Sequence, residues 1–176
     1  MKTNAARLLE REGSPYRLLE YSLDAGDLGA ATAARKLGLP VAQVFKTLVC
    51  RCASNRVCFA VIAGDCELDL KGLARALGER RAETVALREI QPLTGYVRGG
   101  VTVLGAKRRY PAVVDASALG WPQLAVSAGA RGAELMLTPQ DYIRVTEALV
   151  VKDLGRRVRA AGASPAMLEA GEREPD

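Results

Sequence analysis

Lys46 is the first residue of this 176-residue chain whose type and place could do chemistry. It lies in an apolar run, residues 44–49, and in strand geometry it shares a face with Leu48, Cys50 and Cys52. A cation that projects from an apolar row can hold a phosphate, a carboxylate or a developing oxyanion. The alternative is a lysine at a sheet edge, which reaches water and discourages edge pairing. The residues alone leave both interpretations open.

Two glycine-rich stretches, residues 95–105 and 127–132, could present backbone N–H groups to a ligand oxygen. Glycine permits positive φ and close approach of the backbone to a ligand. The first stretch does not fit a P-loop, because Ala106 stands where that motif needs lysine. Both stretches could also be ordinary turns between strands, so they indicate a binding loop only together with other evidence.

Positive charge gathers at Lys107, Arg108 and Arg109, with Arg98 nearby in the sequence. The chain has 25 Lys and Arg against 20 Asp and Glu, a net charge of +5, which suits an anionic partner such as RNA. Two interpretations of this patch stay open: solvated surface, or contacts to phosphates that do not read bases. With two Phe, five Tyr and one Trp, a broad base-stacking platform is not expected.

Histidine is absent from the chain. Ser-His-Asp and Cys-His catalysis are therefore excluded. The chain also lacks the residue that most often binds the metal in catalytic zinc sites. The four cysteines, Cys50, Cys52, Cys58 and Cys66, lack the paired C-x-x-C spacing typical of zinc sites. We expect them to be small buried apolar residues, and we expect neither a metal nor another cofactor.

Helices are expected where apolar residues recur at helical spacing between capping residues. Strands are expected at short β-branched and apolar runs between turn residues. The expected helices run from Asn4 to before Gly13, over residues 30–37, from Asp69 to Gly78, and from Thr138 to about Leu149. The expected strands are residues 16–21, the hairpin 44–52 and 56–62, and residues 112–115, 124–127 and 134–137, with a loop-rich stretch at residues 93–111.

This irregular order has no βαβ cadence and no internal repeat. It predicts a mixed α/β fold with one curved or barrel-like mixed β-sheet surrounded by helices. One domain is expected over residues 1–159, and the small, polar and acidic residues 160–176 are expected to form a disordered tail. No stretch approaches the about 18 to 20 apolar residues that span a bilayer, so a cytoplasmic location without a membrane partner is expected.

Several short motifs follow one another in a fixed order: Phe45-Lys46-Thr47-Leu48, Leu68-Asp69-Leu70-Lys71, Thr94-Gly95-Tyr96, Gly99-Gly100, Leu104-Gly105, residues 111–115, Val126-Ser127 and Arg131-Gly132. Their order and spacing resemble the YbaK/EbsC family, the free-standing relatives of the editing domain inserted in bacterial prolyl-tRNA synthetases. The resemblance covers roughly residues 3–157 and implies a mixed α/β fold around a curved sheet. It also implies hydrolysis of the ester that joins a wrong amino acid to tRNA.

YbaK-type members clear cysteine mischarged onto tRNA(Pro) and act with prolyl-tRNA synthetase, so the resemblance implies tRNA(Pro) and this synthetase as partners, and no DNA. Lys46 matches the family's essential lysine and is the expected catalytic residue. The residues expected to bind substrate are Tyr21, Phe45, Thr47, Gly95, Tyr96, Gly99, Gly100, Gly105, Ser127, Gly129 and Glu134. The residues expected to contact tRNA are Arg98, Lys107, Arg108, Arg109 and Arg131.

Four positions depart from the family pattern. Val103 stands where proline is usual, Ala128 and Ala130 replace a glycine and a lysine, and Glu134 is one methylene longer than the usual aspartate. These departures affect the shape of the pocket and hence its preference among amino acids.

An aminoacyl ester is already activated, so positioning and charge stabilisation can drive its hydrolysis without histidine. With a cysteinyl ester, the resemblance implies that the substrate's own thiol attacks its carbonyl carbon and expels the ribose hydroxyl. Two alternatives remain. The same hydrolase could act on Ala-tRNA(Pro) or another mischarged tRNA with water as nucleophile, or the chain could be a non-catalytic module that binds tRNA or a synthetase.

Overall fold

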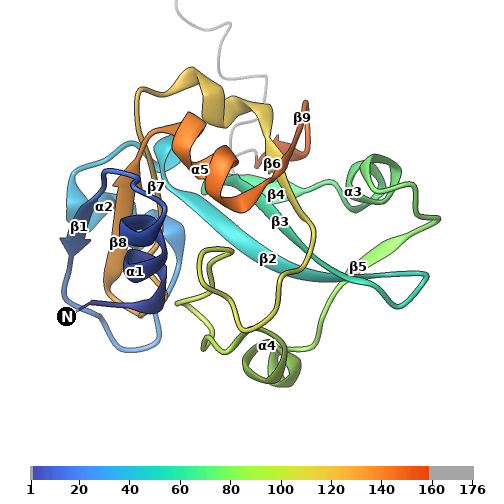
Figure 1. Cartoon of the computed structure of the whole chain (residues 1–176), viewed down its shortest axis with the longest axis horizontal. Coiled ribbons are helices and arrows are strands. Elements are labelled where there is room, and N and C mark those ends of the chain that lie inside the picture. The colour runs from blue at the N-terminus through green and yellow to red at the C-terminus, as the bar shows by residue number, and fades with distance from the viewer. Residues whose placement is uncertain (1, 159–176) are drawn as a thin grey trace, which may run out of the picture.

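The computed structural model describes residues 2–158. Helices and strands alternate irregularly along them, as Figure 1 shows. The helices are α1 (Asn4–Arg11), α2 (Ala30–Leu37), α3 (Leu70–Ala76), α4 (Leu87–Thr94) and α5 (Pro139–Thr146), with the 3-10 turns η1 (Val41–Gln43) and η2 (Ala116–Gly120). The strands are β1 (Arg17–Glu20), β2 (Phe45–Cys52), β3 (Val57–Ala63), β4 (Cys66–Leu68), β5 (Ala82–Thr84), β6 (Ala112–Asp115), β7 (Leu124–Ser127), β8 (Ala133–Leu137), β9 (Leu149–Val151) and β10 (Gly155–Arg157).

The central sheet has five strands in the order β5-β2-β3-β6-β9. β2 and β3 form the antiparallel hairpin expected from the sequence, with Phe45 opposite Ala63 and Arg51 opposite Val57. β6 runs parallel to both β3 and β9. Because this sheet combines antiparallel and parallel pairs and helices pack around it, the expected mixed α/β class is confirmed.

Two smaller sheets accompany the central one. The antiparallel order β1-β8-β7 forms the first, and β10 paired with β4 forms the second. A parallel bridge between Val44 and Ala125 connects the start of β2 to β7. In Figure 1 the β1-β8-β7 sheet lies to the left of the central sheet, and α5 lies in front. Within the described residues the strands are thus divided among three hydrogen-bonded sheets.

Side-chain caps begin three of the helices. Asp69 accepts a hydrogen bond from the backbone N–H of Gly72, and Thr138 accepts one from that of Asp141, as expected for N-caps. At α1 the cap is Thr3, one residue before the expected Asn4, and its hydroxyl oxygen accepts from the N–H of Ala6. The fold therefore follows local capping chemistry at these starts.

The fourth expected helix ends three residues early, at Thr146. Glu147 adopts a left-handed conformation with φ of +54°, which stops α5. The chain then forms β9, in which Leu149 pairs with Val113 of β6. Pairing along the sheet edge, a long-range interaction, therefore overrides the helical pattern.

Two apolar cores occupy the two faces of the β2–β3 hairpin. Phe45, Val49 and Phe59 belong to the larger core, which also includes residues of α1, β7, β8 and α5. On the opposite face Cys50 and Leu73 belong to a smaller core under α3. Cys50, Cys52 and Cys58 are buried and Cys66 is half-buried, and all four are free thiols, as expected for small apolar residues.

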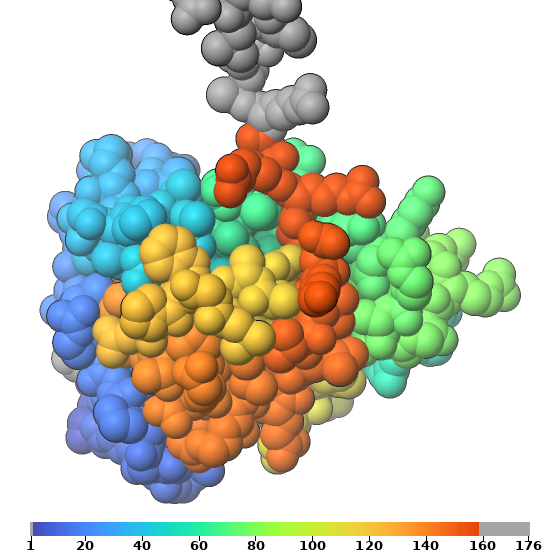
Figure 2. Space-filling model, turned by 90° about the horizontal axis from the view of Figure 1, so that it is seen from above, coloured from blue at the N-terminus to red at the C-terminus, as the bar shows by residue number. Residues whose placement is uncertain are grey.

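The junction between β2 and β7 is supported from outside the sheets. The side-chain amide of Gln43, just before β2, donates to the carbonyl oxygen of Gln123, just before β7, at 2.8 Å. On the face of the molecule seen from above in Figure 2, the yellow segment that carries η2 lies next to orange C-terminal elements. The starts of β2 and β7 are therefore held together by a bridge and a side-chain contact.

The expected tail, residues 160–176, lies outside the described residues. Within residues 2–158 no helix is both long and apolar enough to cross a membrane. The same part of the chain contains no group of three or more Cys, Asp or Glu side chains arranged to hold a metal ion.

Candidate active site

Within the described residues, the first half of β2 has no partner strand in the central sheet on the side where β5 pairs with its second half, which leaves an unpaired edge. β2 pairs with β3 along Phe45–Arg51, but with β5 only through Cys50–Cys52. The N–H of Val85 donates to the carbonyl oxygen of Val49 at 3.0 Å, so the odd-numbered residues of β2 direct their backbone groups to the β5 side. By this alternation, the N–H and C=O of Thr47 face the unpaired edge.

A cavity of about 300 Å³ lies against this edge. Residues from both faces of β2 line it, together with the loop after α4, the ends of β7 and β8, and the segment from β5 to α4. The sequence-predicted site residues that line it are Phe45, Lys46, Thr47, Arg98, Gly99, Ser127 and Glu134. Segments far apart in the sequence therefore converge on one cavity.

Lys46 is one of the residues that line this cavity. Its ammonium Nζ donates to the carbonyl oxygen of Gly64 at 3.4 Å and forms no ion pair among the described residues. Gly64 has no room for a side chain, because a Cβ atom there would lie 2.8 Å from Cβ of Ala30 and 2.8 Å from the carbonyl oxygen of Val44. The position of this carbonyl is thus fixed by packing, and the ammonium keeps its charge available for an anionic group.

Glu134 is the buried carboxyl group of the cavity. The residue is 7% exposed, and its Oε2 atom has no hydrogen-bond partner within the described part of the chain. Burial raises the pKa of Glu134 to about 8, so the group is largely uncharged at neutral pH. It sits directly opposite Ser127 in the β7–β8 register, which brings a carboxyl and a hydroxyl side by side.

Tyr21 lies close to this carboxyl without lining the cavity. Its backbone N–H donates to the carbonyl oxygen of Gly132 at 2.9 Å. Burial, and secondly the charge of Glu134, raise the pKa of the Tyr21 phenol. The structure therefore places Tyr21 as a neighbour of Glu134.

Replacing Glu134 with glutamine should change how stability depends on pH. Between the ordinary pKa of 4.5 and the folded-state pKa of about 8, the unfolded chain releases this proton while the folded chain keeps it. The free energy of unfolding of the wild type therefore falls through this window, by up to about 1.4 kcal/mol per pH unit. In urea denaturation, the free energy of unfolding of Glu134→Gln should therefore rise relative to that of the wild type from pH 5 to pH 8. A difference that stays constant over this range would contradict the buried neutral carboxyl.

The two glycine-rich stretches are joined to each other by Tyr96. Its hydroxyl donates to the carbonyl oxygen of Leu104 at 2.7 Å, and a Cβ atom on Gly129 would lie 2.7 Å from its ring. A Cβ atom on Gly100 would come within 3.2 Å of the backbone of Ala130. Five expected substrate-binding residues of these stretches do not line the cavity: Gly95, Tyr96, Gly100, Gly105 and Gly129.

The Gly129→Ala variant should be less stable than the wild type, because the added methyl group should push apart the two glycine-rich stretches. Its φ of +89° and the 2.7 Å approach to Tyr96 both oppose a side chain. Gly78→Ala is the matched control, because Gly78 has a φ of +68° but nothing within 4 Å of its Cβ position. We expect Gly78→Ala to lose about 1 kcal/mol in urea denaturation and Gly129→Ala to lose roughly 1–3 kcal/mol more; equal losses would contradict the packing role.

The expected tRNA-contacting residues fall into two places. Arg98 lines the cavity, and Nε of Arg131 donates to its carbonyl oxygen at 2.8 Å, so these two lie together at the rim. Lys107, Arg108 and Arg109 are exposed and do not line the cavity. The guanidinium of Arg109 forms an ion pair with Glu147 at 2.7 Å.

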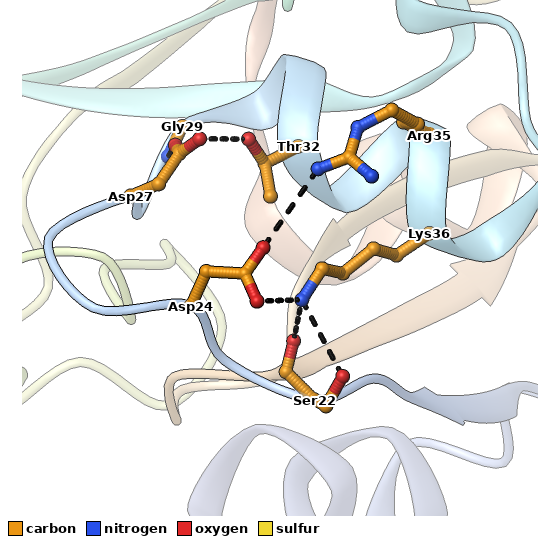
Figure 3. Close-up of polar contacts among 7 residues, drawn as sticks. All are labelled: Ser22, Asp24, Asp27, Gly29, Thr32, Arg35 and Lys36. Atoms are coloured by element: carbon orange, nitrogen blue, oxygen red, sulfur yellow. Dashed lines mark hydrogen bonds and ion pairs between the residues drawn. The ribbon is translucent and has the colours of Figure 1, made fainter.

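A polar network fixes the loop before α2, shown in Figure 3. The carboxylate of Asp27 accepts from the N–H of Gly29 at 3.2 Å and from the hydroxyl of Thr32. Nearby, Lys36 pairs with Asp24 at 2.9 Å. The loop continues into Ala30, which lines the cavity, and Leu28 in the same loop packs against Gly99. The network therefore supports one wall of the cavity.

One apolar wall was missed by the sequence reasoning. Val85, which follows β5, and Leu87 and Ile90 of α4 line the cavity, and neither β5 nor α4 was expected. The signal lay in the i, i+3 spacing of Leu87 and Ile90, and in Glu89, whose carboxylate accepts from the N–H of Ala86. Pro92 inside α4 interrupts the helical pattern and hides it.

The fold and the site together define a class of protein. A histidine-free cavity with a free ammonium, a neutral carboxyl and an unpaired strand edge suits binding and cleavage of an activated acyl group. Residues 28–145 match the aminoacyl-tRNA editing domain, and the chain belongs to this family. It is thereby an aminoacyl-tRNA deacylase, an enzyme that hydrolyses the ester between an amino acid and tRNA, which argues against the non-catalytic alternative.

Named relatives agree with this class. A protein of Enterococcus faecalis, provisionally named Cys-tRNA(Pro)/Cys-tRNA(Cys) deacylase EbsC, is 37% identical over 82% of this chain and 88% of its own length. The multifunctional Ser/Thr-tRNA deacylase ProXp-y of Escherichia coli is 28% identical over 80% of this chain and 84% of its own. A solved structure provisionally described as a trans-editing enzyme for prolyl-tRNA synthetase is 28% identical, with a TM-score of 0.75 over 86% of this chain and 97% of that one. The YbaK/EbsC resemblance is confirmed.

Proposed function

We propose that this protein is a trans-editing deacylase that hydrolyses Cys-tRNA(Pro), with the substrate's thiol as the nucleophile. The observation that carries the proposal is the set of ionisable side chains in the cavity. Within the described residues these are Lys46, Arg98 and Glu134, so two cations and one neutral carboxyl surround the space where the ester would lie. None of them is a ready nucleophile for acyl transfer at neutral pH.

The chain's own cysteines do not offer an alternative nucleophile. Among residues 2–158, none of the four lines the cavity. Burial raises the pKa of Cys50 to about 12 and that of Cys66 to about 11, which keeps both thiols protonated. A free cysteine thiol, with a pKa of about 8.5, is a few per cent ionised at neutral pH and is intrinsically very nucleophilic.

The proposed reaction is an intramolecular acyl transfer followed by hydrolysis. The substrate's sulfur forms a bond to its own carbonyl carbon, and the bond from that carbon to the ribose oxygen breaks. The thiol proton goes to the ribose oxygen, which leaves as the tRNA hydroxyl. Water then opens the resulting thiolactone and releases cysteine. The protein has only to fold the side chain back and stabilise the oxyanion.

Five of the cavity residues have a defined part in this proposal. Lys46 holds the developing oxyanion, or the phosphate or ribose of the terminal adenosine. The unpaired carboxyl of Glu134 receives the substrate's α-amino group, because a buried polar atom without a partner gains most from a ligand donor. Ser127, Gly99 and the backbone of Thr47 close the pocket around the acyl group.

The proposed partners are tRNA(Pro) and prolyl-tRNA synthetase. Support comes from the names of two similar proteins, the Enterococcus faecalis deacylase for Cys-tRNA(Pro) and the solved trans-editing enzyme for prolyl-tRNA synthetase. Exposed arginines at the rim of the cavity supply phosphate contacts for the tRNA, in particular Arg98 and Arg131.

Multiple-turnover deacylation by the purified protein tests this function. Cys-tRNA(Pro) and Cys-tRNA(Cys) are each incubated with a catalytic amount of enzyme, with and without prolyl-tRNA synthetase. We expect many turnovers with Cys-tRNA(Pro), and a further preference for it when the synthetase is present. No release of cysteine from Cys-tRNA(Pro) in either condition would overturn the proposed substrate.

A second candidate uses water in place of the thiol. The pKa of about 8 at Glu134 lies close to neutral pH, where a general base works best. The similarity to a Ser/Thr-tRNA deacylase favours this candidate for substrates that have no thiol. Mischarged tRNAs with other small amino acids, such as alanine or serine, would then be hydrolysed at comparable rates.

A further inference from the structure

A second hollow, of about 530 Å³, adjoins the cavity along α4. Its apolar part includes Leu87, Pro92 and Val97, and its charged part consists of Arg88, Arg98 and Arg131. We call this hollow the α4 groove. Its position matters because Leu87, Ile90 and Arg98 line both the groove and the cavity, so the two spaces lie side by side.

The α4 groove exposes an unusual combination of surfaces. Leu87 is 60% exposed and Val97 is 39% exposed, although both are large apolar side chains. Arg88, Arg98 and Arg131 surround them, are exposed, and form no ion pair within residues 2–158. Apolar side chains ringed by unneutralised guanidinium groups suit a ligand that is flat and apolar on one part and anionic on another.

The cavity itself leaves most of the proposed substrate outside. At about 300 Å³ it is at the lower end of the range for ligand pockets, which is enough for the aminoacyl group and part of the terminal adenosine. The rest of the single-stranded 3′ end of the tRNA must then leave the cavity over a continuous surface. The α4 groove shares three lining residues with the cavity, so it is the adjoining hollow that can serve as this surface.

We propose that the α4 groove binds the nucleotide that precedes the terminal adenosine of the tRNA, with its base on Val97 and Pro92 and its phosphate between Arg88 and Arg131. This inference rests on the proposed function, and it adds a subsite that includes Arg88 and α4. Nε of Arg131 is already fixed on the carbonyl oxygen of Arg98, which orients that guanidinium before RNA arrives. Apolar contacts to the face of a base and contacts to its phosphate tolerate any base, so the subsite has little base preference.

Binding of uncharged tRNA tests the subsite without relying on deacylation. The test variant is Arg88→Ala combined with Val97→Ser, two positions that line the groove but not the cavity. The matched control is Arg17→Ala combined with Leu119→Ser, which replaces an exposed arginine and an exposed apolar residue that lie outside both spaces. Each protein is titrated with tRNA(Pro) that has an intact CCA end and with tRNA(Pro) that lacks these three nucleotides.

We expect the test variant to bind intact tRNA about tenfold more weakly than the wild type, and the truncated tRNA as the wild type does. The salt dependence of binding to intact tRNA should fall by about one ion. Equal weakening for both tRNAs, or no weakening at all, would overturn the subsite. If the wild type does not hydrolyse Cys-tRNA(Pro), the proposed function is overturned instead. The binding comparison would still show whether the α4 groove binds the 3′ end of the tRNA.

Discussion

Lys46→Ala should slow single-turnover deacylation of Cys-tRNA(Pro) by about 10²- to 10³-fold, the loss typical of removing one oxyanion donor. Lys46 lines the cavity, and among the described residues the only hydrogen bond of its ammonium is a long one of 3.4 Å to the carbonyl oxygen of Gly64. A cation without a carboxylate partner in a partly enclosed site interacts strongly with developing negative charge. Rapid quench with labelled cysteinyl-tRNA would measure the rate.

Lys71→Ala is the matched control for this prediction. Lys71 is an exposed residue of α3 that does not line the cavity, so its removal should leave the rate unchanged. Urea denaturation of both variants would separate lost chemistry from lost folding. A loss below about threefold for a folded Lys46→Ala variant would remove Lys46 from the mechanism.

Ser-tRNA(Pro) should be hydrolysed at least about 10²-fold more slowly than Cys-tRNA(Pro). The two substrates differ in the side-chain group that could attack the ester. The serine hydroxyl is a weak nucleophile unless a base activates it, and the chain has no histidine to do so. The two tRNAs would be compared in single turnover at saturating enzyme, so that the rate of the chemical step is measured and not binding.

Ala-tRNA(Pro) and the quadruple cysteine-to-alanine variant complete this comparison. Alanine has no nucleophile, so its ester should also be spared, whereas the variant should keep its activity toward Cys-tRNA(Pro) if it remains folded. Comparable rates for the cysteine, serine and alanine esters would contradict the thiol route. They would favour water activated by Glu134, whose pKa of about 8 allows it to act as a base.

Local sequence signals predicted the elements on which the site is built. The bounds of α2 match the expected residues 30–37, because Gly38 with its φ of +67° ends the helix. The β2–β3 hairpin follows from two apolar runs around a polar turn. By contrast, β4, β5, β9 and β10 are three residues each, and their partners are remote in the sequence, so no local pattern reveals them.

The sequence indicated several residues of the site, but it did not indicate how they are buried or what they pack against. The resemblance singled out Lys46, Ser127 and Glu134, and the structure places all three at one cavity. That Oε2 of Glu134 is buried without a hydrogen-bond partner among residues 2–158 depends on packing between β8 and its neighbours, which no spacing in the sequence predicts. Likewise Tyr96 and Gly129 were expected to face the substrate, whereas they pack against each other and hold the two glycine-rich stretches together.

The most direct measurement is a crystal structure with a stable analogue, adenosine that carries cysteine through a 3′-amide in place of the ester. We predict that the cysteinyl group lies in the cavity beside β2, with its amino group at Glu134 and Nζ of Lys46 at about 2.7–3.2 Å from the acyl oxygen or an adenosine oxygen. A cysteinyl group bound outside this cavity, or an occupied cavity with Lys46 turned away from the ligand, would contradict it.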